Sequence, residues 1–334
     1  MASPTRTPTP VDASEELVSE FGANATYVAE LLNRYRANRA SVDDEWRRFF
    51  DERFGEASAA WEAVPAPAPT APAARPVAPA PAPSAPPAPP IEGERLPIRG
   101  AAARIAENME RSLEVPTATT QRQIPIKLLD ENRRLINHER AAAELPKVSF
   151  THLVSWAVIR ALQAFPGMND AYDGAGGEPT RVRRPHVRFG LAVDVPKADG
   201  SRSLLVPNVP GAEAMRFSEF LAAANDVVSR ARSGKLKVSD FEGTTLSLTN
   251  PGTLGTTASV PRLLPGQGAI IATGAIEYPA EFSAMAPATL SRLAISKVMT
   301  FTSTYDHRII QGAESGAFLA RVEELLLGRD GFYD

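Results

Sequence analysis

The chain has 334 residues, 43% of them hydrophobic and 22% charged, so it can bury the core of one large domain or of two moderate ones. Its formal net charge of -3 gives no electrostatic reason to expect nucleic acid or an anionic membrane as a partner. Cysteine is absent, which excludes disulfides, thiolate metal sites and a cysteine nucleophile. Any thiol in the chemistry has to come from a ligand.

The first residues, Met1 to Pro10, lack the apolar core of a signal peptide. No later run approaches the roughly 18 apolar residues of a membrane-spanning helix. We therefore expect a cytoplasmic protein without a membrane segment. Residues 1–14 are expected to be a disordered tail.

Residues 15–62 are predicted to form a short helical module. One helical stripe carries Tyr27, Val28, Leu31, Leu32 and Tyr35. The segment Ser41–Asp44 offers an N-cap for a second helix, which carries Trp46, Phe49 and Phe50. So short a segment cannot easily bury three large aromatic side chains alone. It is either a loosely folded extension or a docking segment for a partner surface, and the aromatic stripe favours docking.

A linker separates this module from a large domain. From Pro65 to Pro90 the sequence is almost wholly alanine and proline, which cannot build a core and favours extended, polyproline-like conformations. We assign the linker to residues 63–93 and the large domain to residues 94–334.

Helical and strand patterns alternate in the large domain. Helices are predicted around Ile105–Leu113, stopped by Pro116; Leu153–Phe165, stopped by Pro166; Phe220–Ala231, with Gly234 as its C-cap; and Phe318–Leu326. Strands are predicted at Val187–Val195, where apolar residues alternate with period two, and at Thr244–Thr249, Ala269–Ile276 and about Leu290–Tyr305. This mixture predicts an α/β fold around a sheet.

One of the four histidines stands out by position. His138, His152 and His186 lie on a polar helix, near a helix start and in a basic turn, where histidines are usually surface or capping residues. His307 instead follows the last predicted strand and precedes the turn at Gly312. Its imidazole is therefore expected to project from a strand end, where it is placed to take a proton from a thiol. On position alone, a structural role would still be the more common outcome.

A second candidate is the segment Asp240–Gly255, a strand that leads into a glycine-rich turn. A hydroxyl at the strand end, such as Thr249, is suited to stabilise an oxyanion, and the glycines allow a ligand to approach the backbone. Alone the signal is weak, because these residue types are simply those that form turns.

Several motifs together resemble a known family. Their order and spacing are similar to those in the catalytic domain of dihydrolipoyl acyltransferases of 2-oxo acid dehydrogenase complexes. These motifs are Lys147–Asn169, Leu205–Asn208, Gly234–Lys237, Asp240–Gly243, Leu248–Gly252 and Tyr305–Arg308. The resemblance covers about residues 94–334, and the Thr-Asn of the glycine turn looks most like the succinyl-transferring branch.

The N-terminal module carries a second resemblance. Asn24–Leu32 and Ser41–Phe50 look like the extreme N-terminus of the thiamine-dependent decarboxylating subunit of 2-oxoglutarate dehydrogenase, which docks onto the acyltransferase. A chain that carries both this N-terminus and the acyltransferase domain resembles the fused bacterial form, in which the acyltransferase domain lies between that N-terminus and the decarboxylase body. We therefore expect a fragment or a shortened relative, without a thiamine site of its own.

The resemblance implies a chloramphenicol-acetyltransferase-like fold, with a mixed sheet flanked by helices. It implies a homotrimer with each active site at a subunit interface. His307 would be the general base for the thiol of coenzyme A, and Thr249 the donor to the oxyanion formed on a succinyl-dihydrolipoyl arm. Asp306 and Asn250 would support them. Such an enzyme works in a 2-oxoglutarate dehydrogenase complex of the tricarboxylic acid cycle.

One supporting position departs from the family. The family usually has Asp or Asn four residues after the histidine, where this chain has Gln311. The arginine that can pair with that carboxylate in succinyl-transferring members corresponds to Ala102. Since removing both partners of an ion pair can be nearly neutral, we expect a rewired support at Gln311 rather than a ruined site.

The resemblance also implies partners. The chain lacks the Asp-Lys-Ala hairpin on which lipoate is attached, so a lipoyl-domain protein has to bring that arm. The second expected partner is the 2-oxoglutarate decarboxylase, as a separate chain or as a continuation of this one. Coenzyme A is expected as a substrate, its contacts are not assigned, and no metal is expected. Two alternatives stay open, a catalytically silent scaffold and a free-standing small-molecule acetyltransferase.

Overall fold

The computed structural model describes residues 21, 24–54, 97–98, 101–196 and 202–334. The expected tail (1–14) and linker (63–93) lie outside these residues, and so does the side chain of Ala102. The described helices are α2 (Ala25–Ala37), α3 (Asp44–Phe54), α4 (Ala101–Ser112), α5 (Lys127–Ala142), α6 (Phe150–Leu162), α7 (Phe217–Arg232), α8 (Pro287–Arg292) and α9 (Gly312–Leu326). The described strands are β1 (Thr117–Pro125), β2 (Ala171–Asp173), β3 (Thr180–Val182), β4 (Arg188–Leu191), β5 (Val193–Pro196), β6 (Arg202–Leu205), β7 (Asn208–Pro210), β8 (Leu246–Thr249), β9 (Ala269–Thr273) and β10 (Val298–Asp306).

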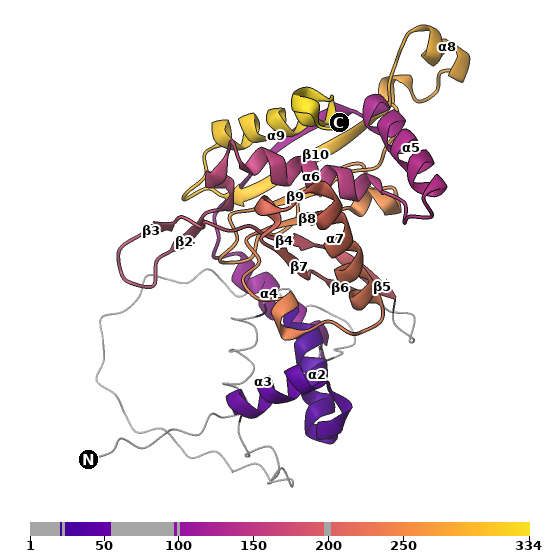
Figure 1. Ribbon diagram of the computed structural model, residues 1–334. Helices are drawn as coiled ribbons and strands as arrows, with labels where there is room; N and C mark the ends of the chain where they lie inside the picture. The colour runs from indigo at the N-terminus through magenta and orange to yellow at the C-terminus, as the bar shows by residue number, and fades with distance from the viewer. Residues whose placement is uncertain (1–20, 22–23, 55–96, 99–100, 197–201) are drawn as a thin grey trace, which may run out of the picture.

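The main sheet is mixed and has the strand order β1-β10-β9-β8-β4-β7. β8 pairs in parallel with β9 and with β4, whereas β10 is antiparallel to both β9 and β1. The β2–β3 hairpin and the segment that carries α8 project from two different corners of the body (Figure 1). This architecture agrees with the predicted mixed sheet flanked by helices.

The two faces of the main sheet differ in polarity. On one face, Phe189 of β4 lies against Phe220 of α7, with ring centroids 6.2 Å apart. On the same side, the Ser303 hydroxyl of β10 bonds to Ser315 of α9 at 3.0 Å. Because side chains alternate along a strand, the neighbours of Ser303 face the other way. That second face is polar and carries Thr300, Thr302 and Thr304 of β10.

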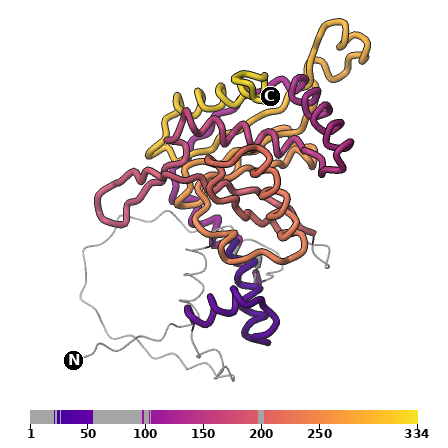
Figure 2. The backbone as a smooth tube through the Cα atoms, viewed as in Figure 1, coloured from indigo at the N-terminus to yellow at the C-terminus, as the bar shows by residue number. Residues whose placement is uncertain are grey.

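The N-terminal module packs on the large domain. Its helices form as the sequence predicts, and Asp43 caps α3 by accepting from the backbone N–H groups of Glu45 and Trp46, each at 3.0 Å. The stripes of both helices join the same hydrophobic cluster as the large domain. The loosely folded extension is therefore wrong for the described part of the module. Its aromatic face is buried against this chain's own large domain. The module lies at the opposite end of the molecule from the C-terminus (Figure 2).

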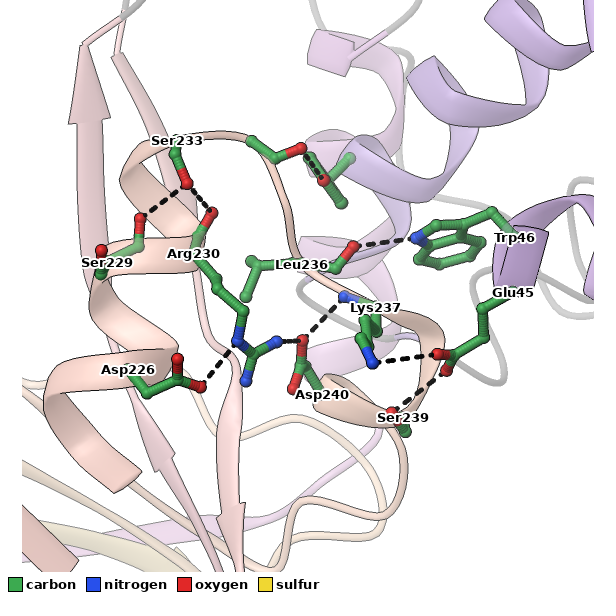
Figure 3. A network of polar contacts seen from close by, with 12 residues as sticks. Glu45, Trp46, Asp226, Ser229, Arg230, Ser233, Leu236, Lys237, Ser239 and Asp240 are labelled. Carbon is green, nitrogen blue, oxygen red and sulfur yellow. Dashed lines mark hydrogen bonds and ion pairs between the residues drawn. The ribbon is translucent and has the colours of Figure 1, made fainter. Parts of the chain in front are cut away.

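The contact centres on the turn that follows α7 (Figure 3). The Trp46 indole N–H donates to the Leu236 carbonyl at 2.9 Å, and its side chain is only 1% exposed. Beside it, Glu45 faces Lys237 at 3.7 Å and accepts from the Ser239 hydroxyl at 3.2 Å. On the opposite side of the turn, Arg230 donates to Asp240. The large domain thus supplies the apolar surface that the module needs to bury its aromatic rings.

Asn24 fixes a second point of this contact. Its side-chain amide donates to the Val206 carbonyl at 3.1 Å, and its side-chain oxygen accepts from the Val206 N–H at 2.7 Å.

The predicted C-cap of α7 is confirmed. Gly234 has a φ of +67°, and the N–H of Lys235 donates to the Arg230 carbonyl at 2.9 Å.

Two strand predictions need correction. The expected strand from Leu290 to Tyr305 begins only at Val298, since Pro287 opens the short helix α8 and the buried Leu290 belongs to that helix. The expected strand from Val187 to Val195 is two strands, β4 and β5, which belong to different sheets. A period-two pattern continues across such a break, so it cannot reveal it.

The strands β1, β2, β3, β6 and β7 were not predicted, and β1 is the longest of them. β1 is the edge of the main sheet and pairs with the whole of β10. Its burial pattern contains one buried residue, Ile124, and its other side chains are mostly threonine and glutamine. An edge strand with so little apolar alternation carries no clear strand signal. Among the described helices, none is both long enough and apolar enough to cross a bilayer.

Candidate active site

His307 projects from the end of the main sheet, as predicted. β10 ends at Asp306, and the next residue, His307, is exposed and donates its backbone N–H to the Pro116 carbonyl at 2.9 Å. The Tyr305 ring lies beside the imidazole, with centroids 5.6 Å apart and planes at 66°. The backbone of His307 is thus fixed while its ring stays accessible to a ligand.

Asp306 holds the turn that carries His307. This buried carboxylate accepts from the Arg308 backbone N–H at 3.1 Å and from its guanidinium at 2.9 and 2.6 Å. The Asp306 carbonyl accepts from Ile309 and Ile310 at 3.2 and 3.0 Å. Arg308 also lies over the Tyr172 ring, 3.7 Å from its centroid. The hydrogen bond to Asp306 raises the pKa of Arg308 above its usual value, so this support stays charged.

Gln311 does not hold this turn through its side chain. It is the N-cap residue of α9 but makes no side-chain capping hydrogen bond, and it is exposed. Its carbonyl accepts from the Ser315 N–H at 3.1 Å. Within this chain, the rewired support expected at Gln311 therefore comes from Asp306 and Arg308, and a Gln311 contact with anything else stays a prediction.

Thr249 is the last residue of β8 and is half-buried. Asn250 leaves the strand with φ −124° and ψ 76°, and its side-chain amide donates to the Thr151 hydroxyl of α6 at 3.1 Å. The glycine turn follows and lies on the end of β9: a Cβ added to Gly252 would stand 2.2 Å from the Gly274 carbonyl oxygen. A hydroxyl at this fixed strand end suits a donor to a developing charge.

The structure does not bring His307 and Thr249 together within one chain. Thr249 pairs with Ala272, and Ala272 pairs with Thr302. Thr249 is thus level with Thr302, five residues before His307 and two strands away. With a rise of about 3.4 Å per residue and about 4.8 Å between strands, the two residues are roughly 20 Å apart. They can share a substrate only if His307 and Thr249 come from different copies.

Two of the remaining histidines, His152 and His186, have partners away from His307 and Thr249. His152 completes the capping box of α6, as its helix-start position suggested, by accepting from the Ser149 N–H at 3.1 Å. His186 faces Glu213 at 2.9 Å. No cluster of three or more His, Asp or Glu side chains suited to a metal ion occurs among the described residues.

The polar face of the sheet was not recognised from the sequence. Thr249, Ala272, Thr302 and Gln121 form one row across four strands, on the face opposite to the helices. The signal was present in β10, where Thr300, Thr302 and Thr304 occupy every second position. Without the pairing partners, that alternation could not be linked to Thr249. The contact between Thr151 and Asn250 could not be recognised from the sequence either, because the two residues are 99 positions apart.

Two protein families match this chain. The model of the 2-oxoacid dehydrogenases acyltransferase catalytic domain matches residues 91–330, and that of the 2-oxoglutarate dehydrogenase N-terminus matches residues 20–53. The second match coincides with the described part of the helical module.

Curated relatives combine both parts. The 2-oxoglutarate dehydrogenase E1/E2 component of Corynebacterium glutamicum is 47% identical over 339 residues, which cover 95% of this chain and 28% of that protein. The multifunctional 2-oxoglutarate metabolism enzyme of Mycolicibacterium vanbaalenii is 43% identical over 355 residues, with the same coverage of 95% and 28%. The chain thus spans somewhat over a quarter of the length of these relatives.

Solved structures share the fold. The crystal structure of Azotobacter vinelandii dihydrolipoamide acetyltransferase is similar with a TM-score of 0.60 and 26% identity, over 72% of this chain and 96% of that one. A probable dihydrolipoamide acetyltransferase from Listeria monocytogenes has a TM-score of 0.58 and 22% identity, over 70% and 94%. These similarities confirm the predicted fold class.

Proposed function

The chain belongs to the acyltransferase family of the 2-oxoacid dehydrogenase complexes, and from this premise we propose that it moves a succinyl group from dihydrolipoamide to coenzyme A. The observation that carries the proposal is the pair of family matches in one chain. An acyltransferase joined to a 2-oxoglutarate dehydrogenase N-terminus is expected to receive the acyl group which that dehydrogenase makes, and this group is succinyl.

The proposed chemistry divides between two side chains. The His307 imidazole takes the proton from the thiol of coenzyme A, and the resulting thiolate forms a bond to the carbonyl carbon of the succinyl thioester. The Thr249 hydroxyl donates to the oxygen that becomes negative. When the bond to the dihydrolipoyl sulfur breaks, that sulfur takes the proton held by His307. The same two groups serve the reverse reaction.

The sheet register supports a site shared between copies. Thr249 is level with Thr302, which is five residues before His307 and two strands away, so the two residues of one chain are roughly 20 Å apart. A closed ring of copies would place the His307 end of one copy at the Thr249 end of the next, and repeat this at every interface. We therefore propose a homotrimer with three such shared sites.

The remaining expectations follow as proposals. Asp306 and Asn250 hold the two reacting residues, and Gln311 supports the site across the interface. A separate lipoyl domain delivers the succinyl group, and a 2-oxoglutarate decarboxylase makes it in the cytoplasm. Residues 15–62 act as the docking module, 63–93 as the linker and 94–334 as the catalytic domain.

The test is acyl transfer by the full chain. Succinyl-CoA and free dihydrolipoamide are supplied, and release of coenzyme A is measured. We expect turnover that falls at least about a hundredfold in His307→Ala, the usual effect of losing a general base. Full turnover by His307→Ala, or none by the well-folded oligomer, would sink the proposal.

One observation favours a second candidate, a catalytically silent scaffold. Gln311 stands where the family has Asp or Asn, and its side chain makes no capping hydrogen bond. Binding of coenzyme A without measurable transfer would favour the scaffold, and robust transfer would end it.

A further inference from the structure

We propose that Thr151 is a positioning residue for acyl transfer, which acts by fixing the strand end that carries Thr249. The inference rests on the proposed function, because Thr249 is the oxyanion donor in that proposal. Thr151 lies in the first turn of α6, and its hydroxyl contacts Asn250, the residue after Thr249. It acts through Asn250.

The contact joins two distant parts of the chain at one point. The Asn250 amide donates to the Thr151 hydroxyl oxygen at 3.1 Å, across 99 positions of sequence. Asn250 follows Thr249 directly, with a backbone conformation that belongs to neither the strand nor the next turn. The orientation of the peptide between Thr249 and Asn250 is therefore set by what holds the Asn250 side chain.

The other end of this bond is rigid. Ser149 caps α6 by accepting from the His152 N–H at 3.2 Å, and His152 accepts in return from the Ser149 N–H at 3.1 Å. Thr151 lies inside this closed turn. Beyond it, nearly every residue of α6 from Leu153 to Leu162 is buried. A side chain on such a platform can hold a partner within the tolerance that catalysis requires.

The strand end has a separate anchor on its other side. The Thr253 hydroxyl donates to the Asn250 carbonyl at 3.2 Å, and the glycine turn rests directly on the backbone of Gly274. Because this second anchor remains, loss of the Thr151 hydroxyl should loosen the direction of Thr249 without unfolding the turn. The expected effect is on turnover, with little change in substrate binding or in folding.

Thr151→Val tests this, because valine keeps the shape and removes the acceptor. We expect kcat to fall about two- to tenfold, the range that one net hydrogen bond contributes. KM for coenzyme A and for dihydrolipoamide should stay within about twofold, the melting temperature should stay unchanged, and Thr151→Ser should restore turnover. Asn250→Ala removes the same bond from its other end and should give a similar loss. That variant decides the outcome if Thr151→Val does not fold.

The deciding comparison is made in a Thr249→Ala background. If Thr151 acts through Thr249, Thr151→Val has no further effect there. An unchanged kcat in Thr151→Val would overturn the positioning role. So would a double variant whose kcat is lowered by the product of the factors measured for Thr151→Val and Thr249→Ala separately. These results leave the proposed function intact, whereas that function fails if His307→Ala keeps full turnover or if the well-folded oligomer shows none.

Discussion

Trp46→Ala should detach the N-terminal module from the large domain. The indole is 1% exposed, donates to the Leu236 carbonyl at 2.9 Å and lies against the rings of Phe21, Phe49 and Phe50. Replacing a buried tryptophan by alanine costs about 3–5 kcal/mol. Since each 1.4 kcal/mol is a factor of ten, the docked population relative to the open one should fall by about a hundredfold to a few thousandfold.

Hydrogen exchange of the full chain measures this opening. Amides of α2 and α3 should exchange faster by about that factor, while those of β8 to β10 keep their protection. Glu45→Ala is the matched control at the neighbouring position. Its contact with Lys237 spans 3.7 Å between partly exposed side chains and is worth at most about 1 kcal/mol.

The two variants separate burial of the aromatic face from the surface ion pair as the cause of docking. If Trp46→Ala and Glu45→Ala open the module equally, then burial of the aromatic face does not hold it. If the protection of β8 to β10 collapses together with that of α2, the module and the large domain unfold as one unit.

Two further predictions concern backbone packing and pH. Gly274→Ala places a Cβ 1.8 Å from the Thr257 carbonyl oxygen, so it should destabilise the fold by about 1–3 kcal/mol in urea unfolding, whereas Gly176→Ala, with open space around it, should be nearly silent. Burial lowers the pKa of His152 below its usual value of about 6.5. Below that pH the unfolded chain therefore binds a proton at His152 more readily than the folded chain does. The free energy of unfolding should therefore fall as the pH drops below about 6.5, and His152→Gln should reduce that slope; an unchanged slope would contradict the assignment.

The sequence predicted those parts of the fold that rest on local patterns. The stripes of α2, α6, α7 and α9 and the C-cap at Gly234 depend on residues within one element, and all of them are present. The break between β4 and β5 and the edge strand β1 depend on pairing partners elsewhere in the chain, which periodicity does not contain. For the same reason, the module's docking surface at Leu236 could not be read from its helices.

The candidate site divides in the same way. The motifs located His307 and Thr249, and each lies at or just after the end of a strand. Only the register shows that the two residues of one chain lie roughly 20 Å apart. Gln311 was assigned to the turn from its spacing to the histidine. The turn is held instead by Asp306, through contacts with Arg308 that spacing alone could not predict.

Complementation between two inactive variants tests the central claim most directly. His307→Ala and Thr249→Ala are each expected to lose acyl transfer, and the two full-length variants are then co-expressed in equal amounts so that mixed oligomers form. In a closed ring, about a quarter of the interfaces would pair an intact His307 from one copy with an intact Thr249 from the next. We predict acyl transfer at about a quarter of the wild-type rate. Mixed oligomers no more active than the two parents would contradict a site shared between copies.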